Sequence, residues 1–80
     1  MKKEERKRES EKIRKVVAEN IVKCREEKNM TQEEVAKAAD LKITVYKKIE
    51  SGEHNLRLCT LISIASALGV NPGKLTKGIM

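Results

Sequence analysis

The stretch from Thr31 to Gly52 constrains the fold of this chain more than any other part of its sequence. It opens with a capping box, in which the Thr31 hydroxyl accepts a hydrogen bond at a helix start and Glu34 reaches back to the cap. The residues that follow predict a short helix, a bend at residues 40–41 and a second helix over about residues 42–51. Gly52 then stands where a glycine usually ends a helix. We therefore predict two short helices that meet at a tight bend.

Length and composition favour one small all-α domain. The chain has 80 residues and a single aromatic side chain, so its core must consist of aliphatic residues. Apolar residues recur at helical spacing, and no sustained alternation typical of strands is present. The net charge of +6 favours a polyanionic partner such as nucleic acid, although net charge also serves solubility alone.

Helices are also predicted on both sides of the central stretch. An apolar stripe starts a long helix that should end near Asn29, and its members are Ile13, Val17, Ile21 and Cys24. A later helix, over residues 57–68, carries a predicted core face with Ile64 partly off it, and that face comprises Leu58, Leu61, Ile62, Ala65 and Leu68. Asn71 and Pro72 start a last short helix. In the second of the two central helices, we expect Ile49 and either Val45 or Tyr46 to be buried.

The chain divides into a charged N-terminal extension at residues 1–12, a domain at 13–77 and a loose end at 78–80. The extension is either helical or frayed, and it either contacts phosphates or acts as a solubilising tail. Its glutamates are interleaved with its lysines and arginines, which favours the tail.

Several classes of function are not supported. Cys24 and Cys59 lie far apart and His54 is the only histidine, so we expect neither a metal site nor a disulfide, and a reducing cytoplasm fits. We see no catalytic constellation and no phosphate-binding glycine loop, and therefore expect no enzyme, no cofactor and no small-molecule ligand. No apolar run is long enough to span a membrane.

Three ordered segments together resemble the phage-repressor (Cro and Xre-like) helix-turn-helix family. They are IVKCREEKNMTQEEVAKAADL, the YKKIESG that ends the second central helix, and LCTLISIASALGVNP. The resemblance covers about residues 17–75 and extends to the family's small single-domain repressor and controller proteins. It implies a five-helix, lambda-repressor-like fold, here with an extended basic first helix. The chain departs from the family pattern at Asp40, Lys42 and Arg57, where small residues are usual.

The resemblance also implies roles for individual residues. In this family the second helix of the pair lies in the DNA major groove, and residues near its start contact base edges. Carried over, the residues that read base edges are Ile43, Thr44, Lys47 and Lys48. Those that position the DNA backbone are Gln32, Lys42, His54 and Asn55. The family's structural ion pair, between its first helix and its reading helix, falls on Arg25 and Glu50.

We therefore expect a sequence-specific regulator of transcription, a repressor that binds double-stranded DNA as a homodimer. One module contacts a half-site, so a second copy is needed about one helical turn away. The predicted dimer surface comprises Val70, Pro72, Leu75 and Ile79. The alternative is a protein-interaction module of an antitoxin-like or co-regulator complex, which the apolar Ile43 and Val45 would favour.

Overall fold

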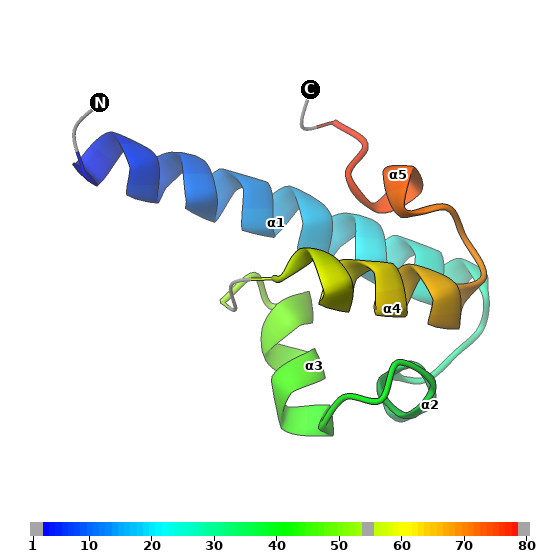
Figure 1. Cartoon of the computed structure of the whole chain (residues 1–80). Helices are drawn as coiled ribbons and strands as arrows, with labels where there is room; N and C mark the ends of the chain where they lie inside the picture. The colour runs from blue at the N-terminus through cyan, green and yellow to red at the C-terminus, as the bar shows by residue number, and fades with distance from the viewer. Residues whose placement is uncertain (1–2, 54–55, 79–80) are drawn as a thin grey trace.

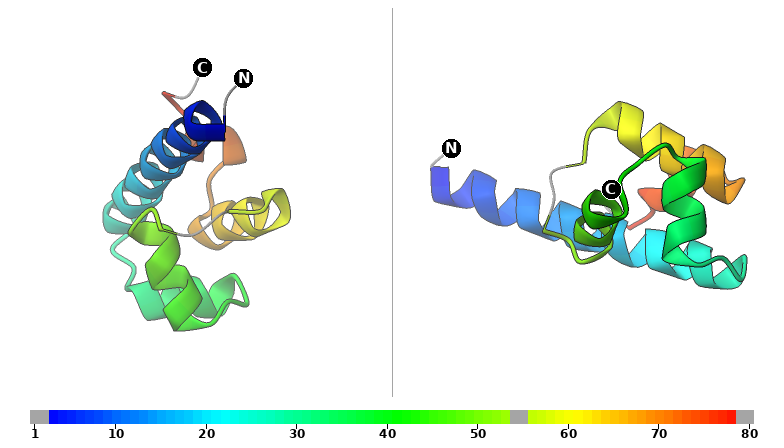
Figure 2. Two further views of the ribbon diagram at one scale, coloured as in Figure 1. Left: turned by 90° about the vertical axis from the view of Figure 1, so that its left-hand side faces the viewer. Right: turned by 90° about the horizontal axis from the view of Figure 1, so that it is seen from below.

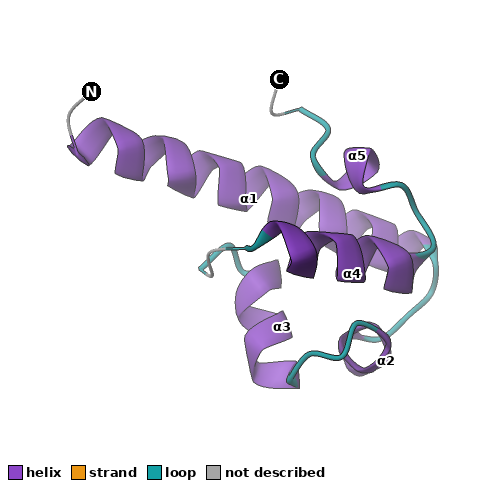
Figure 3. Ribbon diagram, viewed as in Figure 1, coloured by secondary structure: helices purple, strands orange, loops and turns teal. Residues whose placement is uncertain are grey.

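The computed structural model of the chain consists of helices and their connections. It describes residues 3–53 and 56–78, for residues 3–10 the backbone alone. Every regular element within these residues is a helix (Figure 3), which confirms the all-α class. The helices are α1 Lys3–Glu27, α2 Gln32–Ala38, α3 Ile43–Glu50, α4 Leu58–Leu68 and α5 Pro72–Leu75.

The long helix α1 is the element on which most of the others are arranged (Figure 1). Helices α3, α4 and α5 all contact α1, while α2 packs against α3 and α4. The first half of α1 projects past the other helices, as the views of Figure 2 also show. Helix α3 thus connects the α2–α3 pair to α1. It lies next to the point where α1 extends past the other helices (Figure 1).

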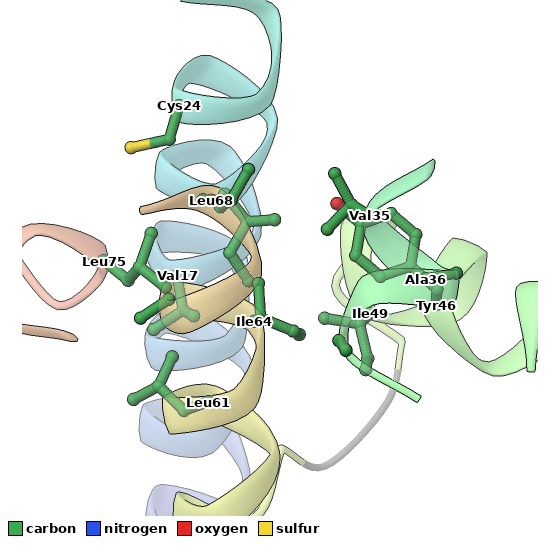
Figure 4. Close-up of a cluster of buried hydrophobic side chains, with 13 residues drawn as sticks. Val17, Cys24, Val35, Ala36, Tyr46, Ile49, Leu61, Ile64, Leu68 and Leu75 are labelled. Carbon is green, nitrogen blue, oxygen red and sulfur yellow. The ribbon is translucent and has the colours of Figure 1, made fainter. Parts of the chain in front are cut away.

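All five helices contribute to one hydrophobic core (Figure 4). Its most completely buried side chains are Tyr46, Ile21, Ile64, Leu75 and Val35. The alanines of α2 matter because small side chains allow close approach of crossing helices, and Ala36 is only 2% exposed. Packing of this kind fixes how α2 and α3 lie relative to α1.

Four of the helices end in the same way, with a residue in the left-handed conformation. These residues are Asn29, Asp40, Gly52 and Gly69, whose φ values are 55°, 58°, 79° and 69°. After each one, the next backbone N–H donates to a carbonyl five residues earlier, as from Leu41 to Ala36 over 2.8 Å. This is the Schellman arrangement, which satisfies otherwise unpaired carbonyls at a helix end. Aspartate therefore adopts the backbone geometry of the bend that glycine usually supplies.

The prediction that Ile13 belongs to the core stripe of α1 is wrong. Its side chain is 45% exposed, and the buried part of the stripe begins at Val17. Figure 2 shows that the N-terminal part of α1 extends past the other helices, so fewer neighbours cover that part of the stripe. Helix α1 also runs unbroken across the boundary predicted between residues 12 and 13.

The predicted core face of α4 was also partly wrong. Leu58 and Ile62 are 72% and 48% exposed, whereas Ile64, expected to lie partly off the face, is fully buried. The face that α4 turns towards α1 and α2 contains Leu61, Ile64, Ala65 and Leu68. Both faces are apolar, so spacing alone did not determine which one is covered.

Candidate nucleic-acid interface

Helix α2 and helix α3 form a compact pair joined by the short connection at residues 39–42. The capping box at the start of α2 is complete, because Thr31 Oγ1 accepts from the Glu34 N–H over 3.1 Å and the Thr31 N–H donates to Glu34 Oε1 over 2.8 Å. Helix α3 begins at Ile43 with Lys42 as its N-cap and ends at Glu50. The Lys42 side chain makes no capping hydrogen bond. The start of α2 is therefore capped by side chains, whereas the start of α3 has no side-chain cap.

The two faces of α3 differ sharply in character. Tyr46 and Ile49 point into the core and are 0% and 3% exposed. On the other side, Thr44, Lys47 and Lys48 are all exposed. These three lie at helical spacings of three and four, so the structure brings them together on one face. The result is a short basic surface with a hydroxyl at its beginning.

Ile43 differs from the other three predicted base readers. It is only partly exposed and packs against the hydrophobic core, as does Val45. The remaining exposed part of Ile43 offers apolar contact alone. The choice between Val45 and Tyr46 as the buried residue is settled in favour of Tyr46.

A buried carboxylate, that of Glu50, holds α3 against α1. Arg25 Nε–H donates to Glu50 Oε2 over 2.7 Å, and its Nη2 donates to Oε1 over 3.2 Å. The side chains are 17% and 6% exposed, so the pair is well shielded from water. The hydrogen bond to Glu50 is the main reason that the pKa of Arg25 is raised. The expected Arg25–Glu50 ion pair is thus present in a bidentate form.

Gln32 belongs to the same network, which the sequence did not suggest. Its Nε2 donates to Glu50 Oε1 over 2.9 Å, and Arg25 Nη1 also donates to the Met30 carbonyl over 3.0 Å. The first residue of α2, the last turn of α1 and the end of α3 are therefore joined through one carboxylate. The Gln32 amide carries a second hydrogen that the bond to Glu50 leaves unused.

Tyr46 lies next to this network without joining it, which sequence reasoning also missed. Its side chain is fully buried, and its hydroxyl has no hydrogen-bond partner within the described part of the chain. Burial raises the pKa of the Tyr46 phenol, and the nearby Glu50 carboxylate raises it further. The sequence signal for this proximity was the spacing of four between Tyr46 and Glu50, which places both residues on one side of α3.

Two side chains of α1 tie it to distant segments, again without a sequence signal. Arg14 Nε–H donates to the Gly52 carbonyl over 3.2 Å. Asn20 Nδ2 donates to the carbonyls of Leu75 and Lys77, both over 2.9 Å. These bonds fix the ends of α3 and α5 to the same helix.

The remaining predicted site residues are dispersed. Lys42 is exposed at the start of α3, while His54 and Asn55 lie outside the described residues, as does Ile79. Val70 and Pro72 are partly buried. Leu75 is 0% exposed and belongs to the core, so its assignment to a dimer surface is wrong.

Residues 3–53 and 56–78 contain neither a candidate metal site nor a candidate membrane-spanning helix. Within these ranges, no three His, Cys, Asp or Glu side chains are placed to hold a metal ion. None of the helices described there is long and apolar enough to cross a membrane.

Comparison with known proteins agrees with this arrangement. The sequence profile of a family described as helix-turn-helix matches residues 21–75. An uncharacterized HTH-type transcriptional regulator, y4dJ of Sinorhizobium fredii, is 37% identical over 59 residues, which are 74% of this chain and 77% of that protein. Control protein C.SmaI of Serratia marcescens is 36% identical over 63 residues, 79% of this chain and 75% of its own.

A solved structure shares the fold. The crystal structure of the restriction-modification controller protein C.AhdI from Aeromonas hydrophila superposes with a TM-score of 0.75. The match covers 78% of this chain and 94% of that one, at 24% sequence identity. The five-helix arrangement is therefore one that a controller protein also adopts.

Proposed function

The chain belongs to the helix-turn-helix family of the phage-repressor (Cro and Xre-like) type, and we propose that this DNA-binding transcriptional regulator inserts α3 into the major groove of double-stranded DNA. The observation that carries the proposal is the exposed face of α3, formed by Thr44, Lys47 and Lys48. It lies on a helix whose other side is locked into the core by Tyr46 and Ile49. A rigid helix with one polar, basic face suits the width of the major groove.

Each exposed residue has a chemical role in this arrangement. The lysines donate to guanine O6 and N7 or to phosphates, and the Thr44 hydroxyl donates or accepts while its methyl group contacts apolar base edges. The exposed part of Ile43 contacts a thymine methyl. Lys42, at the open start of α3, reaches the DNA backbone, which positions the protein without reading sequence.

Gln32 has a double role in the proposal. One amide hydrogen bonds Glu50, and the second is directed to a phosphate beside the first turn of α2. The network of Arg25, Glu50 and Gln32 would then transmit the position of α1 to both DNA-contacting helices. Loss of any member should change the docking of α3 without removing a base contact.

We further propose that two copies act together as a repressor on a two-fold symmetric site. A single α3 covers a half-site, and a symmetric pair of reading helices would match two half-sites about one helical turn apart. Val70 and Pro72 remain available for this pairing, since both are partly exposed.

The alternative function, a protein-interaction module, loses its main support. It was motivated by apolar Ile43 and Val45 on a helix expected to face DNA. Both side chains pack against the core, which accounts for their apolar character without a partner protein.

A matched pair of double variants tests the groove assignment. Lys47→Ala with Lys48→Ala should weaken binding to a duplex selected from a random pool by at least about tenfold, because base contacts contribute roughly 1–3 kcal/mol each. Lys12→Ala with Lys23→Ala removes the same charge from two exposed lysines on the side of α1 opposite its core-facing residues. Equal losses in the two variants would mean that α3 is not the reading helix.

A further inference from the structure

The projecting first half of α1 combines an unusual position with an unusual arrangement of charge. On a helix, alternate steps of four and three residues keep positions on one face. The core line of α1 runs through Cys24, Ile21 and Val17, all buried. Continued towards the N-terminus with the same steps, it passes through Arg14, Ser10, Lys7 and Lys3. The line thus changes from apolar to basic where the other helices stop covering it.

None of the interleaved glutamates lies on this line. Positions 5 and 9 fall on the opposite half of the helix, and positions 4 and 11 border the line on one side, whereas Arg6 borders it on the other. Because α1 is continuous from Lys3 to Glu27, charges that alternate in sequence are sorted onto different faces. We name positions Lys3, Arg6, Lys7 and Arg14 the basic stripe.

The basic stripe begins beside the end of α3. Arg14 donates to the Gly52 carbonyl over 3.2 Å, directly after α3. The backbone of Lys15 also lies close to Gly52, because a Cβ there would stand 3.6 Å from Lys15 Cα. These contacts fix the angle at which α1 leaves the body of the domain.

The projecting part of α1 borders the uncovered side of α3. Figure 1 shows α1 continuing past α3 on the side away from α2. Helix α2 packs on the other side of α3, so α1 projects from the side of α3 that α2 leaves uncovered. A duplex seated on α3 and continuing past its C-terminal end would therefore run beside the projection.

We propose that the basic stripe is a second DNA-contacting surface, which binds phosphates of the duplex flanking the site contacted by α3. The inference rests on the proposed function. Ten residues of helix, from position 3 to position 12, extend about 15 Å. That length corresponds to about four or five base pairs beyond the α3 footprint, at about 3.4 Å per base pair. The contacts would be electrostatic and independent of flanking sequence.

The test compares two triple variants with the same change in charge. The stripe variant carries Lys3→Gln, Arg6→Gln and Lys7→Gln. The control carries Arg8→Gln, Lys12→Gln and Lys23→Gln, whose positions lie on the opposite half of α1. Glutamine is a good helix former, and circular dichroism checks that helix content is unchanged in both. Affinity is measured against salt on a selected site with flanks of about ten base pairs, and on the same site trimmed to the α3 footprint.

The expected result is specific to one face and to one duplex. On the long duplex the stripe variant should bind about tenfold more weakly at low salt, and its salt slope should fall by about 0.9 for each lost phosphate contact. The control should stay close to the wild type, and on the trimmed duplex the stripe variant and the wild type should bind alike.

Equal weakening of the two triple variants would overturn the inference, because net charge alone would then explain it. So would a stripe variant that matches the wild type on the long duplex. If the wild type binds no selected duplex at all, the proposed function itself fails. Wild-type binding that depends on Lys47 and Lys48 but not on the stripe overturns the inference alone.

Discussion

Arg25 Nε–H donates to Glu50 Oε2 over 2.7 Å and thereby joins the last turn of α1 to the last residue of α3. The pair is the chief polar link between the supporting helix and the helix that we assign to DNA. Its value lies in position as much as in stability, since α3 can enter a groove only at the angle that its supports allow.

Breaking this pair from one side should be costly. Arg25→Met leaves the Glu50 carboxylate, whose side chain is 6% exposed, with the Gln32 amide still donating to it. We expect the free energy of unfolding to fall by about 3 kcal/mol, as for other shielded ion pairs that lose one partner. Urea denaturation measures the change.

The double variant Arg25→Met with Glu50→Met is the control for that experiment. It removes both charges, so most of the lost stability should return. A double variant as unstable as the sum of the two single variants would show that the charges do not interact.

Tyr46 should make stability fall at alkaline pH. Burial and the Glu50 carboxylate raise the pKa of its phenol above the ordinary value of 10.0. The unfolded state therefore loses this proton at a lower pH than the folded state. The free energy of unfolding keeps its full value below about pH 10 and falls as the pH rises above it, by up to about 1.4 kcal/mol per pH unit. Unfolding measured from about pH 8 to 11 should show this decline.

Tyr46→Phe is the matched control, because lysine titration is common to both proteins. The variant should lack the tyrosine part of the alkaline decline. At neutral pH it should be as stable as the wild type or slightly more stable, since it removes a buried hydroxyl without a hydrogen-bond partner in the described chain. Tyr46 is the only aromatic residue, so phenol ionisation can be followed directly by ultraviolet absorbance.

The bend between α2 and α3 should be stabilised by glycine. Asp40 has a φ of 58°, a conformation that costs a side-chain-bearing residue energy. Asp40→Gly should raise the free energy of unfolding by about 0.5–1 kcal/mol, and Asp40→Ala should lower it. Urea denaturation of both variants checks the two directions.

Gly69→Ala provides the converse measurement. Its φ is 69°, and a Cβ added there would meet nothing within 4 Å. Any loss is therefore conformational, and we expect about 1–2 kcal/mol. If Asp40→Gly is destabilising while Gly69→Ala is neutral, the left-handed helix ends are not the source of strain.

Two isoleucines of α4 should respond very differently to the same substitution. Ile64 is fully buried and Ile62 is 48% exposed. Ile64→Ala should cost about 2–5 kcal/mol through lost burial and a cavity, whereas Ile62→Ala should cost less than about 1 kcal/mol. Thermal unfolding of the two variants decides whether the covered face of α4 is correctly assigned.

Features that depend on neighbouring residues were predictable from the sequence, as the capping box at Thr31 and the helix end at Gly52 show. The exposure of Leu58 and the burial of Ile64 were not, because both sides of α4 are apolar and only packing against α1 and α2 selects one. Gln32 shows the limit for polar groups, since its bond to Glu50 spans 18 positions.

The N-terminal extension illustrates a further limit. Its interleaved charges favoured a solubilising tail while the sequence alone left its conformation undetermined. In the structure, α1 is one continuous helix, and residues three or four apart share a face. The order of the charges along the sequence therefore does not give their neighbours on the helix.

The central claim is that Lys47 and Lys48 on α3 contact base edges in the major groove. Replacing guanines of a selected site one at a time with 7-deazaguanine removes N7, a major-groove acceptor, and leaves the minor groove unchanged. We predict weaker binding at one or two guanines for the wild type, and no such effect for Lys47→Ala with Lys48→Ala. Wild-type binding that tolerates every 7-deazaguanine but is weakened by inosine, which lacks the minor-groove amino group, would contradict the claim.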